Sequence, residues 1–174
     1  MSDFGHVPVL PVETVALLEP KQGDVIVDLT AGRGGHAELL VQHAKNPSSV
    51  VLFDLDQENL EYATSRIESL GVQVHPFHGN FATAAVTIKN LGLRADCVLA
   101  DLGFASNQMA DPTRGLSFMS DGPLDMRLQT QNGRTAADLV RDLSEEALAD
   151  LIFNLGEDPF ARQIARKIAL ERQK

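Results

Sequence analysis

The chain has 174 residues, of which 44% are apolar, and its formal net charge is −9, so it is long enough for one domain with a buried core, with or without an appendage. No run of 18 apolar residues occurs, and the first 13 residues lack the basic and apolar regions of a signal peptide, so we expect no membrane span and no secretion. Cys97 is the only cysteine, which excludes an intrachain disulfide and cysteine-rich zinc sites and favours a cytoplasmic location.

Short runs rich in β-branched residues predict buried strands, and amphipathic runs between them predict helices. In chain order we expect a helix at 12–18, a strand at 24–29, a helix at 35–44, a strand at 49–54, a helix at 57–70, a strand at 72–77, a helix at 81–91 and a strand at 96–101. Strands that alternate with helices indicate an α/β fold with a parallel, doubly wound sheet.

The alternation stops after the fourth expected strand. Residues 102–134 are punctuated by Gly and Pro and predict a long functional loop. Beyond it only helices are expected, at 135–142, 144–154 and 159–172. We therefore expect a cofactor-binding domain at 1–105, followed at 106–174 by a loop and a helical segment.

A glycine-rich turn lies between the first expected strand and the next helix. Residues 32–37, Gly-Arg-Gly-Gly-His-Ala, fit the G-x-G-x-x-G/A pattern, and Asp54 follows Gly34 by 20 residues. This spacing is typical of dinucleotide binding, in which the acid holds the ribose. Enzymes that use S-adenosylmethionine need a similar turn and a similar acid, and a tight turn that binds nothing has the same pattern. The motif alone leaves these alternatives open.

Three acids, Asp28, Asp54 and Asp101, fall at the expected carboxyl ends of strands. Ligands of open parallel sheets bind outside that edge, so the acids and the glycine turn predict a cofactor site. Asp54 and Asp56 resemble a metal-binding pair, but the histidines show no metal-ligand spacing, and we expect no metal.

The charge is unevenly divided along the chain. Residues 1–105 carry 6 Lys+Arg against 13 Asp+Glu, whereas residues 106–174 carry 9 against 11. An anionic partner is therefore expected to meet the second part, although a solvated surface of mixed charge has the same composition.

Several segments together resemble the ribosomal RNA small subunit methyltransferase H family, also called MraW. They are HVPVLPVETV (6–15), GRGGH (32–36), HGNF (78–81), RGLSFMSDGPLDMR (114–127), GRTAADLV (133–140) and GEDPFARQIARKI (156–168). The resemblance covers nearly the whole chain in order. It implies a Rossmann-like class I methyltransferase fold with a helical substrate-recognition insertion. It also implies methyl transfer from S-adenosylmethionine to N4 of a cytidine in 16S rRNA, at the decoding site of the small ribosomal subunit.

The resemblance also implies site residues by motif position. The expected cofactor contacts are Gly34, Gly35, His36, Asp54, Phe81, Asp101 and Gln108. Asp101 is in addition the candidate catalytic residue, because a carboxylate favours the nearby sulfonium and can accept a hydrogen bond from the target amine. Arg114 and Arg127 are candidate substrate contacts, with the alternative that they pair with Asp121 or Asp125 to shape the loop.

Two features depart from the family pattern. Leu29, Phe104, Ala105 and Asn107 replace the usual residues near the methyl-donor end, so we expect a reshaped pocket. The chain also ends inside the helical insertion, which predicts a fragment or a natural remnant whose sheet has an exposed edge and an exposed apolar face, and for which we expect either marginal stability or self-association. The alternatives are a non-catalytic remnant that binds cofactor or RNA, and a nicotinamide-dependent oxidoreductase.

Overall fold

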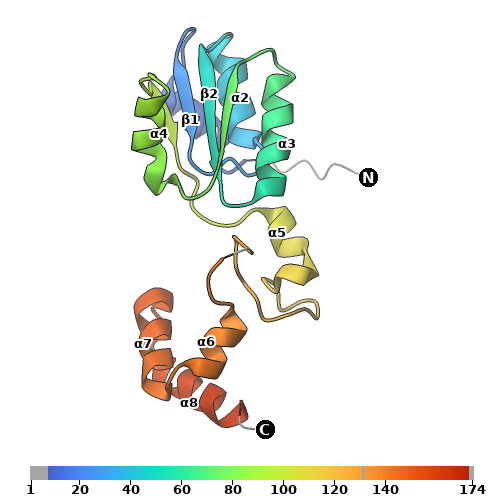
Figure 1. The fold of residues 1–174 in the computed structure, drawn as a ribbon, viewed down its shortest axis with the longest axis vertical. Coiled ribbons are helices and arrows are strands. Elements are labelled where there is room, and N and C mark those ends of the chain that lie inside the picture. The colour runs from blue at the N-terminus through green and yellow to red at the C-terminus, as the bar shows by residue number, and fades with distance from the viewer. Residues whose placement is uncertain (1–7, 131, 173–174) are drawn as a thin grey trace. The chain divides into compact units, whose positions relative to one another are not determined.

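The computed structural model describes residues 8–130 and 132–172, which form two compact units that divide between Ser106 and Asn107 (Figure 1). The first unit contains a parallel sheet with helices, and the second contains helices and a looped segment. Among the described residues, no helix is both long enough and apolar enough to span a membrane.

The first unit alternates helices and strands, as the sequence predicts. Its elements are α1 (Pro11–Leu18), β1 (Val25–Asp28), α2 (Gly35–Ala44), β2 (Ser49–Asp54), α3 (Gln57–Glu68), β3 (Val74–His78), the 3₁₀ turn η1 (Phe81–Thr83), α4 (Ala84–Asn90) and β4 (Cys97–Leu99). The strand β4 is shorter than expected. Its neighbour β1 ends at Asp28 and the chain then turns toward β2, where the N–H of Ala31 donates to the carbonyl of Phe53 over 2.8 Å.

The four strands form one parallel sheet in the order β3-β2-β1-β4, which confirms the expected fold class. In the central strand β1, Val27 pairs with Val51 of β2 on one side and with Val98 of β4 on the other. All four residues of β1 are buried. A strand buried on both faces reads as a continuous apolar run rather than as an alternating one, which is why the sequence revealed it.

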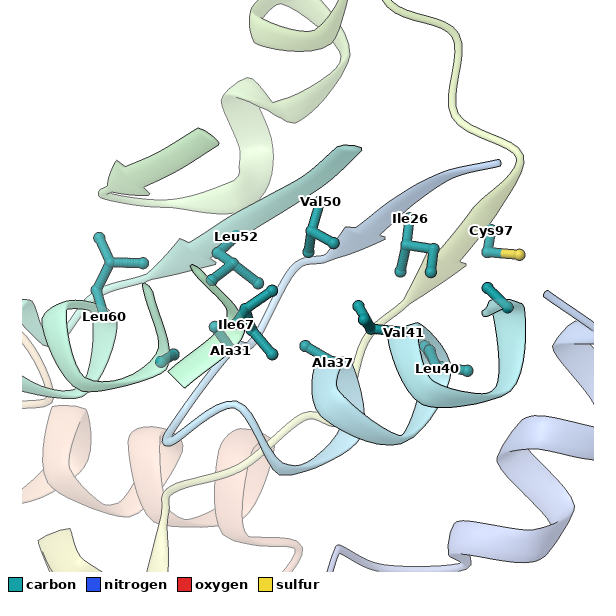
Figure 2. Packing of buried hydrophobic residues seen from close by; sticks show 12 residues of the cluster. Ile26, Ala31, Ala37, Leu40, Val41, Val50, Leu52, Leu60, Ile67 and Cys97 are labelled. Atoms are coloured by element: carbon teal, nitrogen blue, oxygen red, sulfur yellow. The ribbon is translucent and has the colours of Figure 1, made fainter. Parts of the chain in front are cut away.

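Helices cover both faces of this sheet (Figure 1). Figure 2 shows Ile26 and Val50 pointing toward α2, where they join a cluster that includes Leu40, and Ile67 of α3 belongs to the same cluster. On the opposite face Phe53 and its neighbours pack against α4. Because every neighbouring pair of strands is parallel, all the carboxyl ends meet at one edge of this sheet.

The strand β4 lies at one edge of the sheet and is only partly covered. Val98 is 50% exposed, and the residues that follow the strand include the exposed Leu102 and Phe104. The expected exposure of apolar side chains at this edge is therefore found, whereas self-association through it stays a prediction.

The second unit is mostly helical. Its elements are α5 (Ser106–Ala110), which begins at the boundary, the 3₁₀ turn η2 (Pro112–Arg114), α6 (Ala136–Asp142), α7 (Glu145–Gly156) and α8 (Ala161–Glu171). The three later helices match the expected ones. The expected loop at 102–134 contains α5 and η2 instead of being irregular throughout, because Asp111 caps η2 through the N–H of Thr113 and α5 is too short to show a helical period.

Helices α7 and α8 pack on each other through Leu148, Ala149 and Ala165. The last turn of α8 is also tied to α6, since Nη1 of Arg172 donates to the carbonyls of Val140 and Leu143 over 2.7 and 2.6 Å. Such bonds supply partners for the carbonyl groups that a helix end leaves unpaired.

After η2 begins, the backbone approaches itself closely at two glycines. A side chain at Gly115 would collide with the carbonyl of Pro123, and one at Gly122 would collide with the carbonyl of Pro112. Between these two glycines, Phe118 is 97% exposed. These close backbone approaches explain why glycine stands at both positions.

Glycine is required at position 34, in the turn before α2, partly because helix α3 packs closely against it. Its φ of +77° lies in the left-handed region, and a Cβ there would sit 3.2 Å from Cα and Cβ of Ala63 in α3. The turn thus needs glycine whether or not a ligand approaches its backbone.

Replacing Gly34 by Ala is expected to destabilise the chain more than replacing Gly71 by Ala. Gly71 has a similar φ of +79° but no atom within 4 Å of its would-be Cβ, so its variant pays only the left-handed strain of about 1 to 2 kcal/mol. Gly34→Ala adds the collision with Ala63, about 1 to 3 kcal/mol more. Urea unfolding followed by circular dichroism measures both, and equal losses would contradict the packing argument.

Candidate functional site

Three carboxylates gather at the carboxyl edge of the sheet. Asp28 and Asp54 are the last residues of β1 and β2, and Asp101 follows the end of β4 by two residues. These strands are neighbours and parallel, so their ends meet at one edge. The charges of Asp54 and Asp101 both raise the pKa of Asp28, which shows that the three groups are close enough to interact.

Asp28 is completely buried in this cluster. Burial raises the pKa of its carboxyl to about 7, with the charges of Asp54 and Asp101 acting in the same direction. The N–H of Thr30 donates to Oδ1 over 3.0 Å and works against the rise by favouring the carboxylate. Asp28 is therefore a buried group that changes its charge near neutral pH.

Asp54 closes the glycine turn. Its Oδ2 accepts the N–H of Gly32 over 2.7 Å, and its Oδ1 accepts the N–H of Asp56 over 2.8 Å. Burial raises the pKa of Asp54, and these two N–H groups oppose that rise. Asp56 in turn caps α3 through the N–H groups of Glu58 and Asn59. The aspartates of the Asp-Leu-Asp sequence therefore both bind backbone, and no group of His, Cys, Asp and Glu in the described part of the chain could hold a metal ion.

His36 brings α2 to the same edge. It lies in the first turn of α2 and is buried, and its Nε2 is 3.8 Å from Oδ2 of Asp101. The side chain of Asp101 is 45% exposed, so this carboxylate faces both the histidine and solvent. Gly35 begins α2, and the N–H groups of that first turn make the helix start a favourable place for a negative group.

Phe81 follows β3 in the 3₁₀ turn η1 and is 38% exposed. The N–H of Gly79 donates to the carbonyl of Asp54 over 2.9 Å, which holds this segment beside the end of β2. Phe81 is thus partly exposed instead of buried in the core of the sheet, and its contact with a cofactor stays a prediction.

The other predicted site residues belong to the second unit. Gln108 is buried on α5. Arg127 forms a two-pronged pair with Asp125, with Nε–Oδ1 and Nη2–Oδ2 distances of 2.7 Å, and the pKa of Asp125 is lowered by it. Arg114 lies 3.5 Å from Asp111. The alternative that Arg127 pairs with Asp125 is therefore observed, and its contact with substrate stays a prediction.

Leu29, which departs from the family pattern, packs against the cluster around Phe53. Its side chain therefore fills the core beside α4. Thr30, which the sequence reasoning did not select, accepts the N–H of Asp101 through Oγ1 over 2.7 Å. No local signal in the sequence points to it, because this bond joins residues 71 positions apart in the chain.

The free energy of unfolding is expected to fall as pH rises from about 4 to about 7. The pKa of Asp28 is raised from 3.8 in the unfolded chain to about 7 in the fold, so the fold favours the protonated form and loses that advantage as the pH passes 7. The loss is about 4 kcal/mol at most, at about 1.4 kcal/mol per unit of pKa. Urea unfolding at pH 5 and pH 8 measures about 3 kcal/mol of this loss, because the part below pH 5 lies outside the interval.

Asp28→Asn is the control, because the amide has a similar shape and no charge to gain. The difference between pH 5 and pH 8 should shrink by most of this amount in the variant. An unchanged pH dependence would show that Asp28 does not titrate in this range.

Comparison with known proteins identifies the family. Residues 3–174 match the MraW methylase family. Ribosomal RNA small subunit methyltransferase H of Carboxydothermus hydrogenoformans is 43% identical over 173 residues, which are 99% of this chain and 55% of that protein. The protein of the same name from Syntrophotalea carbinolica is 44% identical over 166 residues, 95% of this chain and 53% of that protein.

The chain spans about half the length of the curated relatives it matches. Among solved structures, NSun6 from Pyrococcus horikoshii with SFG aligns at 23% identity with a TM-score of 0.43, over 83% of this chain and 32% of that one, a similarity too low to carry an argument. The sequence match is decisive: since it runs from residue 3 to residue 174, the chain belongs to the MraW methylase family and its parallel sheet to a Rossmann-like methyltransferase fold.

Proposed function

We propose that this chain binds S-adenosylmethionine and serves the methylation of N4 of a cytidine in 16S rRNA, at the decoding site of the small ribosomal subunit. Family membership supports the proposal, as do the relatives, which are named ribosomal RNA small subunit methyltransferases. The observation that carries it is the glycine turn, closed by Asp54, beside three carboxylates at one edge of the sheet. An rRNA substrate also accords with a cytoplasmic location.

The residues at the edge fit this cofactor. The carboxylate of Asp54 keeps acceptor capacity for a ligand, because a carboxylate offers about four acceptor positions and the backbone N–H groups of Gly32, Asp56 and Leu55 do not use all of them. The remaining positions would hold the ribose hydroxyls, and the exposed ring of Phe81 would support the adenine. Gly34, Gly35 and His36 would surround the amino-acid part.

Asp101 is assigned the methyl-donor end. The bound cofactor supplies a methyl group on a positively charged sulfur, and a partly exposed carboxylate is the group at this edge best suited to face it. The same carboxylate would accept a hydrogen bond from the cytosine amine, whose lone pair is otherwise delocalised into the ring. It would thereby orient N4 at an attack distance of roughly 3 Å.

No protein nucleophile is needed for this transfer. Cys97, the only cysteine, is buried in β4, and burial raises the pKa of its thiol. A thiol that resists ionisation is a poor nucleophile. The chain therefore serves direct transfer between the two substrates.

Access to N4 requires the cytidine to leave its stack. We assign the lining of its pocket to 111–134, where Arg114 and Arg127 would hold phosphate or carbonyl groups of the RNA. The pair of Arg127 with Asp125 shapes this segment.

Calorimetric titration of the 174-residue chain tests the cofactor. S-adenosylmethionine should bind and NAD should not, and Asp54→Asn should weaken S-adenosylmethionine by about tenfold or more, since hydrogen bonds to a charged group are worth about 1.5 to 3 kcal/mol each. Glu68→Gln, an exposed residue of α3, is the matched control and should bind like the wild type. Binding of NAD alone would overturn the proposal.

A comparison of Arg127→Ala with Asp125→Ala tests the substrate role. Both variants break the same ion pair, but only the first removes a cation that can meet RNA. We expect Arg127→Ala to weaken binding of a 16S rRNA fragment several-fold more than Asp125→Ala does, and to lower the salt dependence of binding. Equal effects in a gel-shift titration would leave Arg127 with a loop-shaping role only.

A further inference from the structure

Thr30 lies where the central strand leaves its neighbour. The N–H of Leu29 still donates to the carbonyl of Leu99 over 2.9 Å, as in a regular pair of β1 and β4. One residue beyond Thr30, the N–H of Ala31 donates to Phe53 of β2 over 2.8 Å. The backbone, which pairs with both β2 and β4 along β1, thus stays beside β2 and leaves β4 after Leu29, so that the residues after Leu99 lose their strand neighbour.

The hydroxyl of Thr30 connects the two segments beyond the point where β1 and β4 separate. Its Oγ1 accepts the N–H of Asp101 over 2.7 Å, although the backbone of β1 has already turned away. The backbone N–H of Thr30 donates to Oδ1 of the buried Asp28 over 3.0 Å. Asp101 is therefore bonded, through one side chain, to a turn residue that directly follows the buried strand β1.

The imidazole of His36 faces the side-chain carboxylate of Asp101. Its Nε2 is 3.8 Å from Oδ2, so the aspartate is held by its backbone on one side and faces a buried imidazole with its carboxylate. A displacement of the backbone at Asp101 would move the carboxylate away from this place. The hydroxyl of Thr30 accepts the N–H of Asp101 itself, so it is placed to oppose such a displacement.

We propose that Thr30 is a positioning residue for the methyl donor, whose hydroxyl fixes the backbone of Asp101 so that the carboxylate of Asp101 faces the sulfonium. This inference rests on the proposed function, in which Asp101 lies at the methyl-donor end. It adds to that function a residue that does not itself touch the cofactor.

Three variants of the 174-residue chain separate the hydroxyl from the rest of the side chain. Thr30→Val keeps the shape and removes the hydroxyl, with both its bond to the N–H of Asp101 and its hydrogen bond to Asp28, Thr30→Ser keeps the hydroxyl, and Thr30→Ala removes both the hydroxyl and the methyl group. Circular dichroism and thermal unfolding establish that each is folded, and Thr30→Ala replaces Thr30→Val if the latter is not. Hydrogen exchange of the Asp101 amide, measured without cofactor, should be about tenfold faster in Thr30→Val and near the wild-type rate in Thr30→Ser.

Two ligands then show whether the bond to Thr30 positions the carboxylate of Asp101 toward the sulfonium or only connects the two backbone segments. S-adenosylmethionine carries the positive sulfur, and S-adenosylhomocysteine is the same molecule with a neutral sulfur. Thr30→Val should raise the Kd for S-adenosylmethionine about tenfold and that for S-adenosylhomocysteine less than about threefold, and Thr30→Ser should restore both. Asp101→Asn should show the same preference, and the double variant should add little, since coupled residues are not additive.

Equal weakening of both ligands by Thr30→Val, or equal loss in Thr30→Ser, would overturn the positioning role while leaving the proposed function intact. If the wild-type chain binds neither ligand, the proposed function fails and the methyl-donor role of Thr30 fails with it. An accelerated amide exchange in Thr30→Val would then show only a structural tie between the two strands.

Discussion

The carboxylate of Asp54 holds the glycine turn closed, and the arrangement of the other groups at the carboxyl edge of the sheet depends on this contact. One oxygen accepts the N–H of Gly32 and the other accepts the N–H of Asp56, so a single side chain joins the turn before α2 to the start of α3. Helix α3 then lies where Ala63 reaches the backbone of Gly34. These contacts connect the turn, the two helices and the end of β2 to one another. A ligand that binds at the turn therefore meets a surface that is held from several sides.

Negative charge is concentrated at this edge at the expense of stability. Burial and mutual repulsion raise the pKa of Asp28, and burial raises that of Asp54, so the fold tolerates these groups rather than gaining from them. A strained arrangement of this kind is common at functional sites. A positively charged ligand would relieve the repulsion, which is the physical reason that a sulfonium suits the edge.

The sequence predicted the sheet well because β1 and β2 are buried on both faces and end in aspartates that mark the edge. It predicted less where tertiary contacts decide. The glycine pattern suggested a ligand near Gly34, which stays a prediction, but it did not reveal the close approach of Ala63, because nothing in the local sequence identifies a helix that arrives about 30 residues later. Thr30 escaped selection because its importance arises from the divergence of two strands, which no spacing reveals.

The close backbone approaches at Gly115 and Gly122 have a consequence for the residues between them. Both ends of this short loop are pinned by close backbone approaches, while its tip carries the nearly fully exposed Phe118 and the exposed Met119. The conformational entropy of closing the loop is therefore lost when the second unit folds, not when the tip meets another molecule. A molecule that bound at the tip would have to order the side chains of Phe118 and Met119 but not the backbone of the loop. The loop is therefore a preorganised segment with an exposed apolar tip.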